Sequence, residues 1–204
     1  MNKIKVLNLY AGIGGNRKGW DNSKIEVVAV ELNREIATIY KHFFPMDKVI
    51  IADAHKYLLE HYKEFDFIWA SPPCPTHSRI RFMNQTQNKP IFPDMKLYEE
   101  ILFLKHYFKG KWVVENVKSF YEPLIKPFVV GSHFYWANFI IPDKKDREGR
   151  QHNGTIAAKQ KRKGFDLSNF NYIDKQKVLR NCVEPEFGKY IFDLAFINKQ
   201  QTLK

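Results

Sequence analysis

Short apolar runs alternate with segments of helical periodicity along the first two-thirds of the chain. Helical spacing marks residues 33–43 and 54–62, and a third segment runs from Asp94, a suitable helix cap, to about residue 108. Strands that alternate with helices predict an α/β fold with a mostly parallel sheet. The strand-like runs are residues 4–9, 26–31, 49–52, 65–70 and 112–115.

The last third of the chain has a different pattern. Residues 134–141 are aromatic and strand-like, whereas residues 143–171 are polar and basic and contain KKDREGR and KQKRKG. Such a stretch is typical either of a solvated or disordered loop or of a segment that binds a polyanion. From Lys175 the pattern is helical again, with a break expected around Pro185 and Gly188.

Chemically suggestive residues gather at the predicted strand ends. Ligands of parallel α/β sheets bind beyond the carboxyl ends of the strands. The sequence therefore predicts one site at that edge of the sheet. Its members are the glycines of LNLYAGIGG, Glu31, Cys74, and the neighbours Glu115 and Asn116.

Composition and charge narrow the class of protein. The 204 residues, 44 % hydrophobic and 27 % charged, suit one soluble domain, and no apolar run is long enough to span a bilayer. The N-terminal residues lack a signal-peptide pattern, so we expect an intracellular, cytoplasmic protein. The net charge of +11 favours nucleic acid over a membrane surface as partner, and a basic protein without such a partner is the alternative.

The chain has two cysteines, Cys74 and Cys182. Two thiols so far apart do not suggest a disulfide framework. No cluster of Cys and His has the spacing of metal ligands, so we expect no metal.

The glycine-rich stretch LNLYAGIGG directly follows the first predicted strand. Its spacing matches neither G-x-G-x-x-G nor a P-loop, so phosphate binding is disfavoured. Glu31 can accept hydrogen bonds from ribose hydroxyls, and Asp53 can bond an adenine amine or cap a helix. An adenosine ligand without phosphates fits this set, with S-adenosylmethionine as the candidate; a plain strand-to-helix turn is the alternative.

Several blocks of the chain resemble the cytosine carbon-5 DNA methyltransferase family. The combination of Pro-Pro-Cys with Glu-Asn-Val about 40 residues later is the most specific of them. The resemblance implies a Rossmann-like, S-adenosylmethionine-dependent methyltransferase fold with helices on both faces of a mostly parallel sheet, and a small basic target-recognition segment. The blocks, in family order, are LNLYAGIGG, VAVELN, ADA around Asp53, SPPC, VVEN and LRNCVEPEFGKYI.

The resemblance also implies roles for the matching positions. The catalytic residues would be Cys74, Glu115 and Asn116. Cys74 would be the nucleophile that adds to carbon 6 of cytosine, and Glu115 would be a protonated group that donates to ring nitrogen 3. Cys182 is expected to be structural. The implied cofactor pocket comprises Tyr10, Ala11, Gly12, Gly14, Gly15, Glu31, Asp53, Pro73 and Asn181.

The stretch SPPCPTHSR indicates how the thiol would be presented. Two prolines stiffen the chain so that Cys74 projects from the strand end, although a proline-rich turn with an incidental cysteine is the alternative. Arg79 and Arg81 are expected to lower the thiol pKa or to bind phosphates. In the family, the stretch matching residues 78–93 is a mobile loop that closes on DNA, whose target base is flipped out of the duplex.

The chain departs from the family pattern at two places. Asn8-Leu9-Tyr10 stands where the family usually has Asp-Leu-Phe. The family's Gln-x-Arg-x-Arg block, one arginine of which reaches the cytosine carbonyl, is replaced by VVGSHFYWANF. His133 is the candidate for that contact, and a packed strand histidine is the alternative.

We expect duplex DNA as the partner, with transfer-RNA methylation or a non-catalytic DNA-binding subunit as alternatives. The expected setting is the cytoplasm and nucleoid of a bacterial or phage-infected cell, where a restriction-modification or phage partner is compatible with the sequence. Residues 1–140 would form the catalytic core, 141–172 a reduced target-recognition segment with few base contacts, and 173–204 a segment that returns to the core. The expected nucleic-acid contacts are Arg79, Arg81, His133, Lys161, Arg162 and Lys163.

Overall fold

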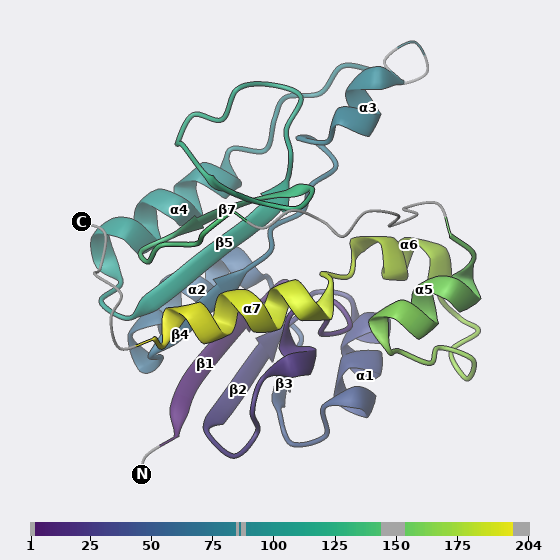
Figure 1. The fold of residues 1–204 in the computed structure, drawn as a ribbon, viewed down its shortest axis with the longest axis horizontal. Coiled ribbons are helices and arrows are strands. Elements are labelled where there is room, and N and C mark those ends of the chain that lie inside the picture. Colours follow the sequence, from purple (N-terminus) through teal and green to yellow (C-terminus); the bar gives the residue numbers. More distant parts are fainter. Residues whose placement is uncertain (1–2, 85, 87–88, 144–153, 198–204) are drawn as a thin grey trace.

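A computed structural model describes residues 3–84, 86, 89–143 and 154–197 of the chain. The described residues form one sheet in the order β3-β2-β1-β4-β5-β7-β6 (Figure 1). The first five strands in this order are parallel to one another, and β7 runs antiparallel to both β5 and β6. The strands are β1 (Ile4–Leu9), β2 (Ile25–Val30), β3 (Lys48–Ile50), β4 (Phe67–Ala70), β5 (Lys111–Val117), β6 (Phe128–Val130) and β7 (His133–Ala137).

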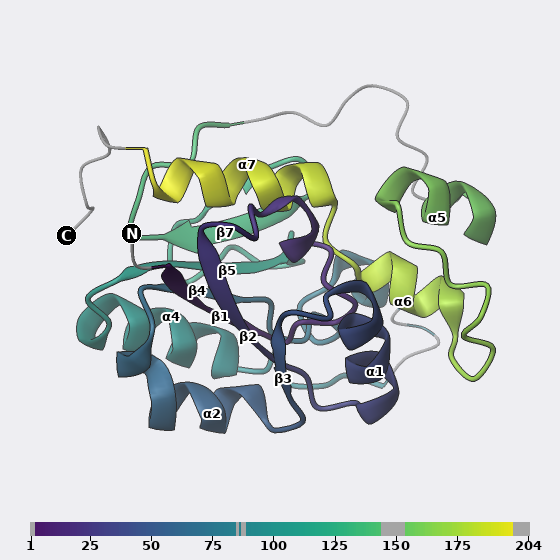
Figure 2. The same cartoon turned by 90° about the horizontal axis from the view of Figure 1, so that it is seen from below.

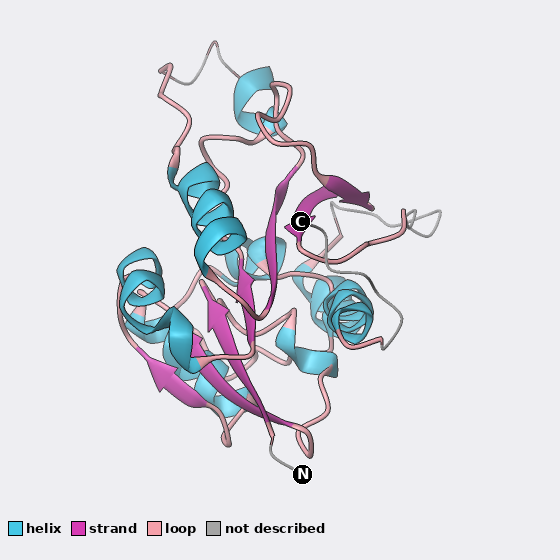
Figure 3. Cartoon of the chain, turned by 90° about the vertical axis from the view of Figure 1, so that its left-hand side faces the viewer, coloured by secondary structure: helices cyan, strands magenta, loops and turns pink. Residues whose placement is uncertain are grey.

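Helices lie on both faces of this sheet, which confirms the predicted architecture. Figure 2 shows α7 above the sheet and α2 and α4 below it, and Figure 3 shows strands running between helices. The α-helices are α1 (Arg34–Phe43), α2 (Ala54–His61), α3 (Arg79–Met83), α4 (Lys96–Tyr107), α5 (Ile156–Lys163), α6 (Lys175–Asn181) and α7 (Pro185–Ala195). Two short 3-10 helices are η1 (Arg17–Gly19) and η2 (Tyr62–Glu64).

Strand β1 illustrates why two helical layers are needed. Its side chains alternate between the faces, because successive residues of a strand point in opposite directions. Val6 packs in the core under α7, together with Trp20, whereas Leu7 and Leu9 pack in the core over α2 and α4. Apolar side chains lie on both faces, and the one buried polar side chain of β1, that of Asn8, bonds that of Asn16, so the strand is buried on both sides, as is typical of parallel sheets.

The helix starts follow the capping residues of the sequence. The side chain of Asn33 accepts a hydrogen bond from the backbone N–H of Ile36 at the start of α1, and Asp53 accepts one from Lys56 at the start of α2. Capping of this kind satisfies backbone donors that have no partner inside the helix. Both side chains lie at the edge of the sheet where the predicted site is placed.

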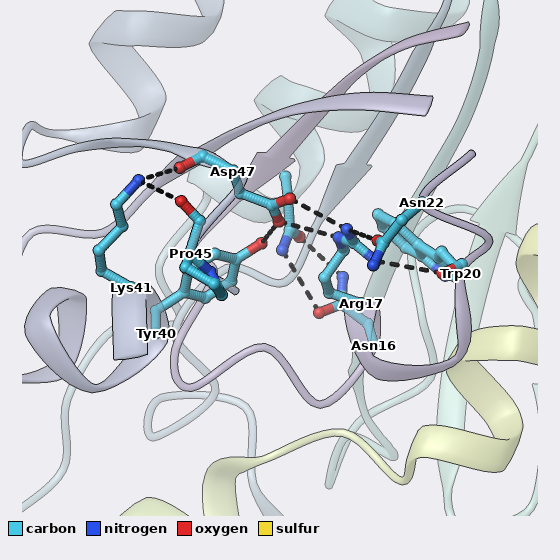
Figure 4. A network of polar contacts seen from close by, with 9 residues as sticks. Asn16, Arg17, Trp20, Asn22, Tyr40, Lys41, Pro45 and Asp47 are labelled. Carbon is cyan, nitrogen blue, oxygen red and sulfur yellow. Dashed lines mark hydrogen bonds and ion pairs between the residues drawn. The ribbon is translucent and has the colours of Figure 1, made fainter. Parts of the chain in front are cut away.

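A buried polar network fastens the segment after β1 to the end of α1 (Figure 4). The guanidinium of Arg17 donates to both carboxylate oxygens of Asp47, at 2.8 and 2.9 Å, and Tyr40 donates to the same carboxylate at 2.8 Å. Both charged side chains are about 3–4 % exposed. A buried pair with several hydrogen bonds holds one geometry, so this network specifies where the chain turns after the first strand.

Three expectations from the sequence need correction. Residues 78–93, expected as one long loop, contain α3, which Ser78 caps by accepting from the N–H of Ile80. The aromatic strand expected at 134–141 ends at Ala137. The sequence predicts a break in the helical pattern around Pro185 and Gly188. In the structure Pro185 begins α7, and Gly188 lies inside that helix. A Cβ at Gly188 would lie 2.4 Å from the carbonyl oxygen of Asn16, so glycine permits the close packing of α7 on the chain before η1.

Candidate active site

The carboxyl ends of β1, β2, β4 and β5 meet at one edge of the sheet. The segment Tyr10 to Gly15 follows β1, Glu31 follows β2, and Cys74 lies four residues beyond the end of β4. Glu115 lies near the carboxyl end of β5, one residue beyond the last pair that β5 forms with β4, and it pairs with Tyr135 of the antiparallel strand β7. The structure therefore gathers at one edge the residues that the sequence singled out.

Glu31 ties the glycine loop to the end of β2. One carboxylate oxygen accepts from the backbone N–H of Gly12 at 3.0 Å, and the other accepts from that of Asn33 at 2.9 Å. Gly12 has a φ of +55°, and no atom lies within 4 Å of the place where a Cβ would be. This open space above a backbone in the left-handed region is where a ligand can approach the loop closely.

The other two glycines serve packing. A Cβ at Gly15 would lie 2.2 Å from the carbonyl oxygen of Val183 and 2.5 Å from the sulfur of Cys182. A Cβ at Gly14 would lie 2.2 Å from the ring of Phe44. The chain after α6 therefore presses directly on the glycine loop, and Asn181, the exposed last residue of that helix, lies beside this junction.

Tyr10 is held in an unusual conformation by a buried acid. Its φ is +54°, a region that costs a bulky residue about 1–3 kcal/mol. Its hydroxyl donates to the carboxylate of Glu100 on α4, a side chain with no exposed surface. His55 on α2 lies 3.0 Å from the same carboxylate oxygen, and burial together with Glu100 raises the pKa of the Tyr10 hydroxyl. Two helices thus anchor the first residue of the loop.

The carboxylates of Glu31 and Asp53 have exposed apolar neighbours in the chain. Leu32 and Ile51, which neighbour Glu31 and Asp53 in the chain, are apolar and yet 69 % and 47 % exposed. Exposed apolar side chains beside carboxylates suit a flat ring with polar edges. Asp53 is half-buried and its backbone hydrogen bond from Lys56 lowers its pKa, so its carboxylate is ionised and can accept further bonds. The remaining predicted pocket members are Ala11, which is buried, and Pro73, which is exposed.

Cys74 lies in a partly buried position that disfavours its thiolate. Burial raises the thiol pKa above its ordinary value, and the carboxylate of Glu115 raises it further. The cation that opposes this shift is Arg180 on α6. The expected role of Arg79 and Arg81 in lowering this pKa needs correction, because their guanidinium groups bind the carbonyl oxygens of Ser119 and Lys89 at 3.0 Å.

Glu115 has the buried environment that the sequence suggested. It is 7 % exposed, and His133 on the antiparallel neighbour β7 places Nε2 3.6 Å from its carboxylate. In the register Val117 lies opposite His133, so the histidine and the acid are diagonal neighbours on one face. His133 therefore lies beside the acid at the edge of the site and is about one-third exposed.

Asn116 joins β5 to the proline turn that precedes Cys74. The nitrogen of its side-chain amide donates to the carbonyl oxygen of Pro72 at 3.0 Å, and the oxygen of the same amide accepts from the backbone N–H of Val117. The side chain is 2 % exposed, so both bonds are shielded from water. Asn116 thus fixes the turn that precedes Cys74.

Some contacts of the site escaped the sequence analysis. Glu100 falls on the buried face of α4 with Leu97, Ile101 and Leu104, so an acid at an apolar helical position was the available signal. His77, 1 % exposed, places Nδ1 2.6 Å from the hydroxyl of Tyr121 and joins the segment after Cys74 to the loop after β5. Only a tertiary structure reveals that pair, because 44 residues separate its members.

The predicted basic contacts divide into two groups. Lys163 is 4 % exposed and donates to the carboxylate of Glu184 at 2.7 Å and to the carbonyl oxygen of Cys182, so its assignment as a nucleic-acid contact is wrong. Arg162 pairs with the same carboxylate at 2.9 Å, whereas Lys161 is exposed. The stretch KKDREGR lies largely at 144–150, outside the described residues.

The segment after α5 is part of the core rather than a solvated loop. Phe165, Leu167 and Phe170 are buried against Ile13 and Ile39. The division into residues 1–140, 141–172 and 173–204 remains a prediction.

Cys182 has the character of a structural thiol. It is 8 % exposed, and burial raises its pKa to about 11. Among the described residues, no group of three or more His, Cys, Asp and Glu is placed to hold a metal ion. Within the same part of the chain, no helix combines the length and apolar character required to cross a bilayer.

Comparison with known proteins places this geometry in a family. Human tRNA (cytosine(38)-C(5))-methyltransferase is 28 % identical over 128 residues, which cover 59 % of this chain and 32 % of the relative. The enzyme of the same name from Spodoptera frugiperda is 34 % identical over 80 residues, covering 37 % of this chain and 24 % of the relative. The matched region thus spans about a third or less of the length of these curated relatives.

Among solved structures, a mutant of Spodoptera frugiperda DNMT2 has a TM-score of 0.47 at 23 % identity, covering 72 % of this chain and 54 % of that one. The family model described as C-5 cytosine-specific DNA methylase matches residues 4–124. This range holds the loop after β1, Glu31, Cys74 and Glu115, and S-adenosylmethionine is the cofactor that the match implies. The family model covers more than half of the chain, including these residues at the edge of the sheet, and the chain therefore belongs to the C-5 cytosine-specific DNA methylase family.

Proposed function

We propose that this chain methylates carbon 5 of cytosine in a nucleic acid, with Cys74 as the nucleophile. The observation that supports this most directly is the placement of Cys74 and the buried acid Glu115 at neighbouring strand ends, close enough for the acid to raise the thiol pKa. The open space above Gly12 lies at the end of the next strand along the sheet. A nucleophile, an acid and a cofactor loop then face one site.

The thiolate of Cys74 forms a bond from its sulfur to carbon 6 of the cytosine ring, which makes carbon 5 electron-rich. Glu115, when protonated, donates its proton to ring nitrogen 3 and so offsets the negative charge that the addition creates. The glycine loop and Glu31 would hold S-adenosylmethionine, which would provide an electrophilic methyl group for carbon 5. Solvent water accepts the proton that leaves carbon 5. The carbon 6–sulfur bond then breaks to release the thiolate, and ring nitrogen 3 returns its proton to Glu115.

The raised pKa of Cys74 sets a requirement for this chemistry. In the free protein burial favours the thiol form, so the reaction requires a cation close to the sulfur when the substrate is bound. Arg180 is the cation that favours the thiolate in this geometry. Asn116 holds the carbonyl of Pro72, which keeps the turn before Cys74 in place.

Duplex DNA is the substrate that the sequence and the description of the matching family model favour. The second candidate is transfer RNA, because the curated relatives are named as transfer-RNA methyltransferases. A non-catalytic subunit is disfavoured, since both Cys74 and Glu115 are present. In either case Lys161 is an exposed candidate for phosphate contact, and Lys163 is not.

The test measures transfer of radiolabelled methyl groups to duplex DNA and to transfer RNA at equal salt concentration, since salt alone changes apparent specificity. We expect the wild-type chain to label one of the two, and Cys74→Ala to label neither while binding S-adenosylmethionine as the wild type does. Oligonucleotides with 5-fluorocytosine should trap a covalent adduct that survives denaturing electrophoresis. Methyl transfer by Cys74→Ala at more than a few per cent of the wild-type rate would show that the nucleophile is a different group.

A further inference from the structure

The segment after Cys74 is docked on the loop after β5 by a set of short contacts. The backbone N–H of Phe120 donates to the carbonyl oxygen of His77 at 3.1 Å, and Ser78 forms an isolated antiparallel bridge with Ser119. Arg79 adds a hydrogen bond to the carbonyl oxygen of Ser119 at 3.0 Å. Residues 77–82 and 118–121 therefore form one local unit next to the nucleophile.

At the outer end of this unit, two aromatic rings lie parallel. The rings of Phe82, on α3, and Phe120 have centroids 4.8 Å apart and an interplanar angle of 3°. Both side chains remain exposed, at 46 % and 39 % of their surface. A pair whose only role is to hold the two segments together is expected to be buried, because exposed aromatic surface is unfavourable in water. The outward surfaces of a parallel pair allow a third flat ring to continue the stack.

The surroundings of the pair are apolar and positively charged at once. Ile80, Met83 and Phe92 in the neighbouring segment are 67 %, 78 % and 95 % exposed. The segments 77–96 and 118–127 together contain six Lys and Arg residues and two acidic residues. This combination matches a polyanion that carries flat apolar rings, which is the chemistry of an unpaired nucleic-acid strand.

The position of the pair relative to the reacting groups is also suitable. The backbone N–H of His77 donates to the carbonyl oxygen of Cys74 at 3.0 Å, so the unit begins directly at the nucleophile. Phe120 lies five residues beyond Glu115, so the chain between them spans at most about 18 Å. A base within a few nucleotides of a cytosine in the site can therefore reach the rings.

We propose that Phe82 and Phe120 form a stacking platform for an unpaired base that lies within a few nucleotides of the target cytosine. The proposal rests on the proposed function for the identity of the target base. It goes beyond that function because it requires the bases around the target to be unpaired, a condition that a fully paired duplex, the first candidate substrate above, does not meet. A base inside a duplex already stacks on both faces and offers only its edges, whereas a loop or single strand offers a free face.

The test uses fluorescein-labelled hairpins with a cytosine in the loop, as DNA and as RNA, and fully paired duplexes of the same sequence. Dissociation constants are measured by anisotropy at one fixed salt concentration. We expect Phe120→Ala to weaken hairpin binding by about 5- to 100-fold, the range for losing one base–aromatic stack, and to leave duplex binding unchanged. Phe120→Trp should bind as the wild type does, and Tyr107→Ala, an exposed aromatic at the far end of α4, is the matched control.

Abasic nucleotides locate the contact. Replacing loop bases one at a time should reveal one position at which the abasic hairpin binds weakly to the wild type and Phe120→Ala causes no further loss. Phe120→Leu, which keeps apolar bulk without a ring, gives the same measurement if Phe120→Ala does not fold, as judged by circular dichroism.

Three results would overturn the platform: equal losses on hairpin and duplex, no loss on either, or no abasic position that cancels the effect. Self-association of the wild type that Phe120→Ala abolishes would likewise overturn it, because the rings would then contact a second copy. Failure of the proposed function is distinguishable, since it leaves ring-dependent hairpin binding intact and removes only methyl transfer.

Discussion

Lys163 and Lys161 lie two residues apart on α5 and should respond to alanine in opposite ways. The ammonium of Lys163 is buried between the carboxylate of Glu184 and the carbonyl oxygen of Cys182, whereas Lys161 is exposed. Because Cys182 packs directly on Gly15, this lysine fastens the end of α6 to the cofactor loop. We expect Lys163→Ala to destabilise the fold and Lys161→Ala to leave it unchanged.

The magnitude follows from what remains after the substitution. Removing one partner of a buried ion pair costs about 3–5 kcal/mol when the other charge is left alone. Here Glu184 keeps the guanidinium of Arg162 at 2.9 Å, so its carboxylate is not left unpaired. The loss is then one to two hydrogen bonds that involve charge, or about 2–3 kcal/mol. For a chain of 204 residues this lowers the melting temperature by roughly 4–12 °C.

The assay is thermal and urea unfolding of wild type, Lys163→Ala and Lys161→Ala, followed by circular dichroism. Lys161→Ala should stay within about 0.5 kcal/mol of wild type. Lys163→Met, which keeps the aliphatic stem, should lose most of what Lys163→Ala loses. The reasoning is refuted if Lys163→Ala and Lys161→Ala melt together, and the loss belongs to packing instead of charge if Lys163→Met restores stability.

Three further predictions concern the site. The single-turnover rate should rise with pH by up to about tenfold per unit below the raised pKa of Cys74, because only the thiolate reacts. Arg180→Ala should move the midpoint of the pH–rate curve upward, because it removes the cation that favours the thiolate. A rate that is flat from pH 6 to 8 would contradict this. Glu31→Ala should weaken S-adenosylmethionine binding by about 1.5–3 kcal/mol in calorimetry, and unchanged affinity in a folded variant removes the acid from the pocket. Asn116→Ala should lower kcat about 10- to 100-fold with little change in KM, whereas a change in KM alone would mean that it does not position Cys74.

The strand and helix pattern was predictable because each element carries its own local signal. The β1 range is the same in sequence and structure, and α1 begins after Asn33, the capping residue that precedes its apolar stripe. The helix α3 was missed because its five residues, RIRFM, are too few to show a period and lie in a polar stretch. Gly188 was read as a break, since the sequence does not show that Asn16 approaches it.

For the site, the sequence identified residues but not how they are held. Cys74, Glu115 and Glu31 stand out by residue type and strand-end position. Lys163 was misassigned because the sequence KQKRKG does not show whether a given lysine contacts solvent or Glu184. The packing of α5 against the segment after α6 determines which lysine is buried. The anchoring of Tyr10 by Glu100 depends on a contact across 90 residues, which no local pattern encodes.

The packing of α7 has a consequence for synthesis on the ribosome. Trp20 donates a hydrogen bond to the carbonyl oxygen of Gly188, 168 residues later, and stacks on Phe192 at 4.5 Å, so the segment that holds Trp20 waits for a partner that is synthesised much later. Until α7 leaves the exit tunnel, Trp20, Phe67 and Trp69 form a bare aromatic face on the nascent sheet. Contacts between residues so far apart in the sequence slow folding and prolong the exposure of apolar surface that is prone to aggregation. We therefore expect the speed of translation and chaperone binding during this interval to affect the yield of native protein.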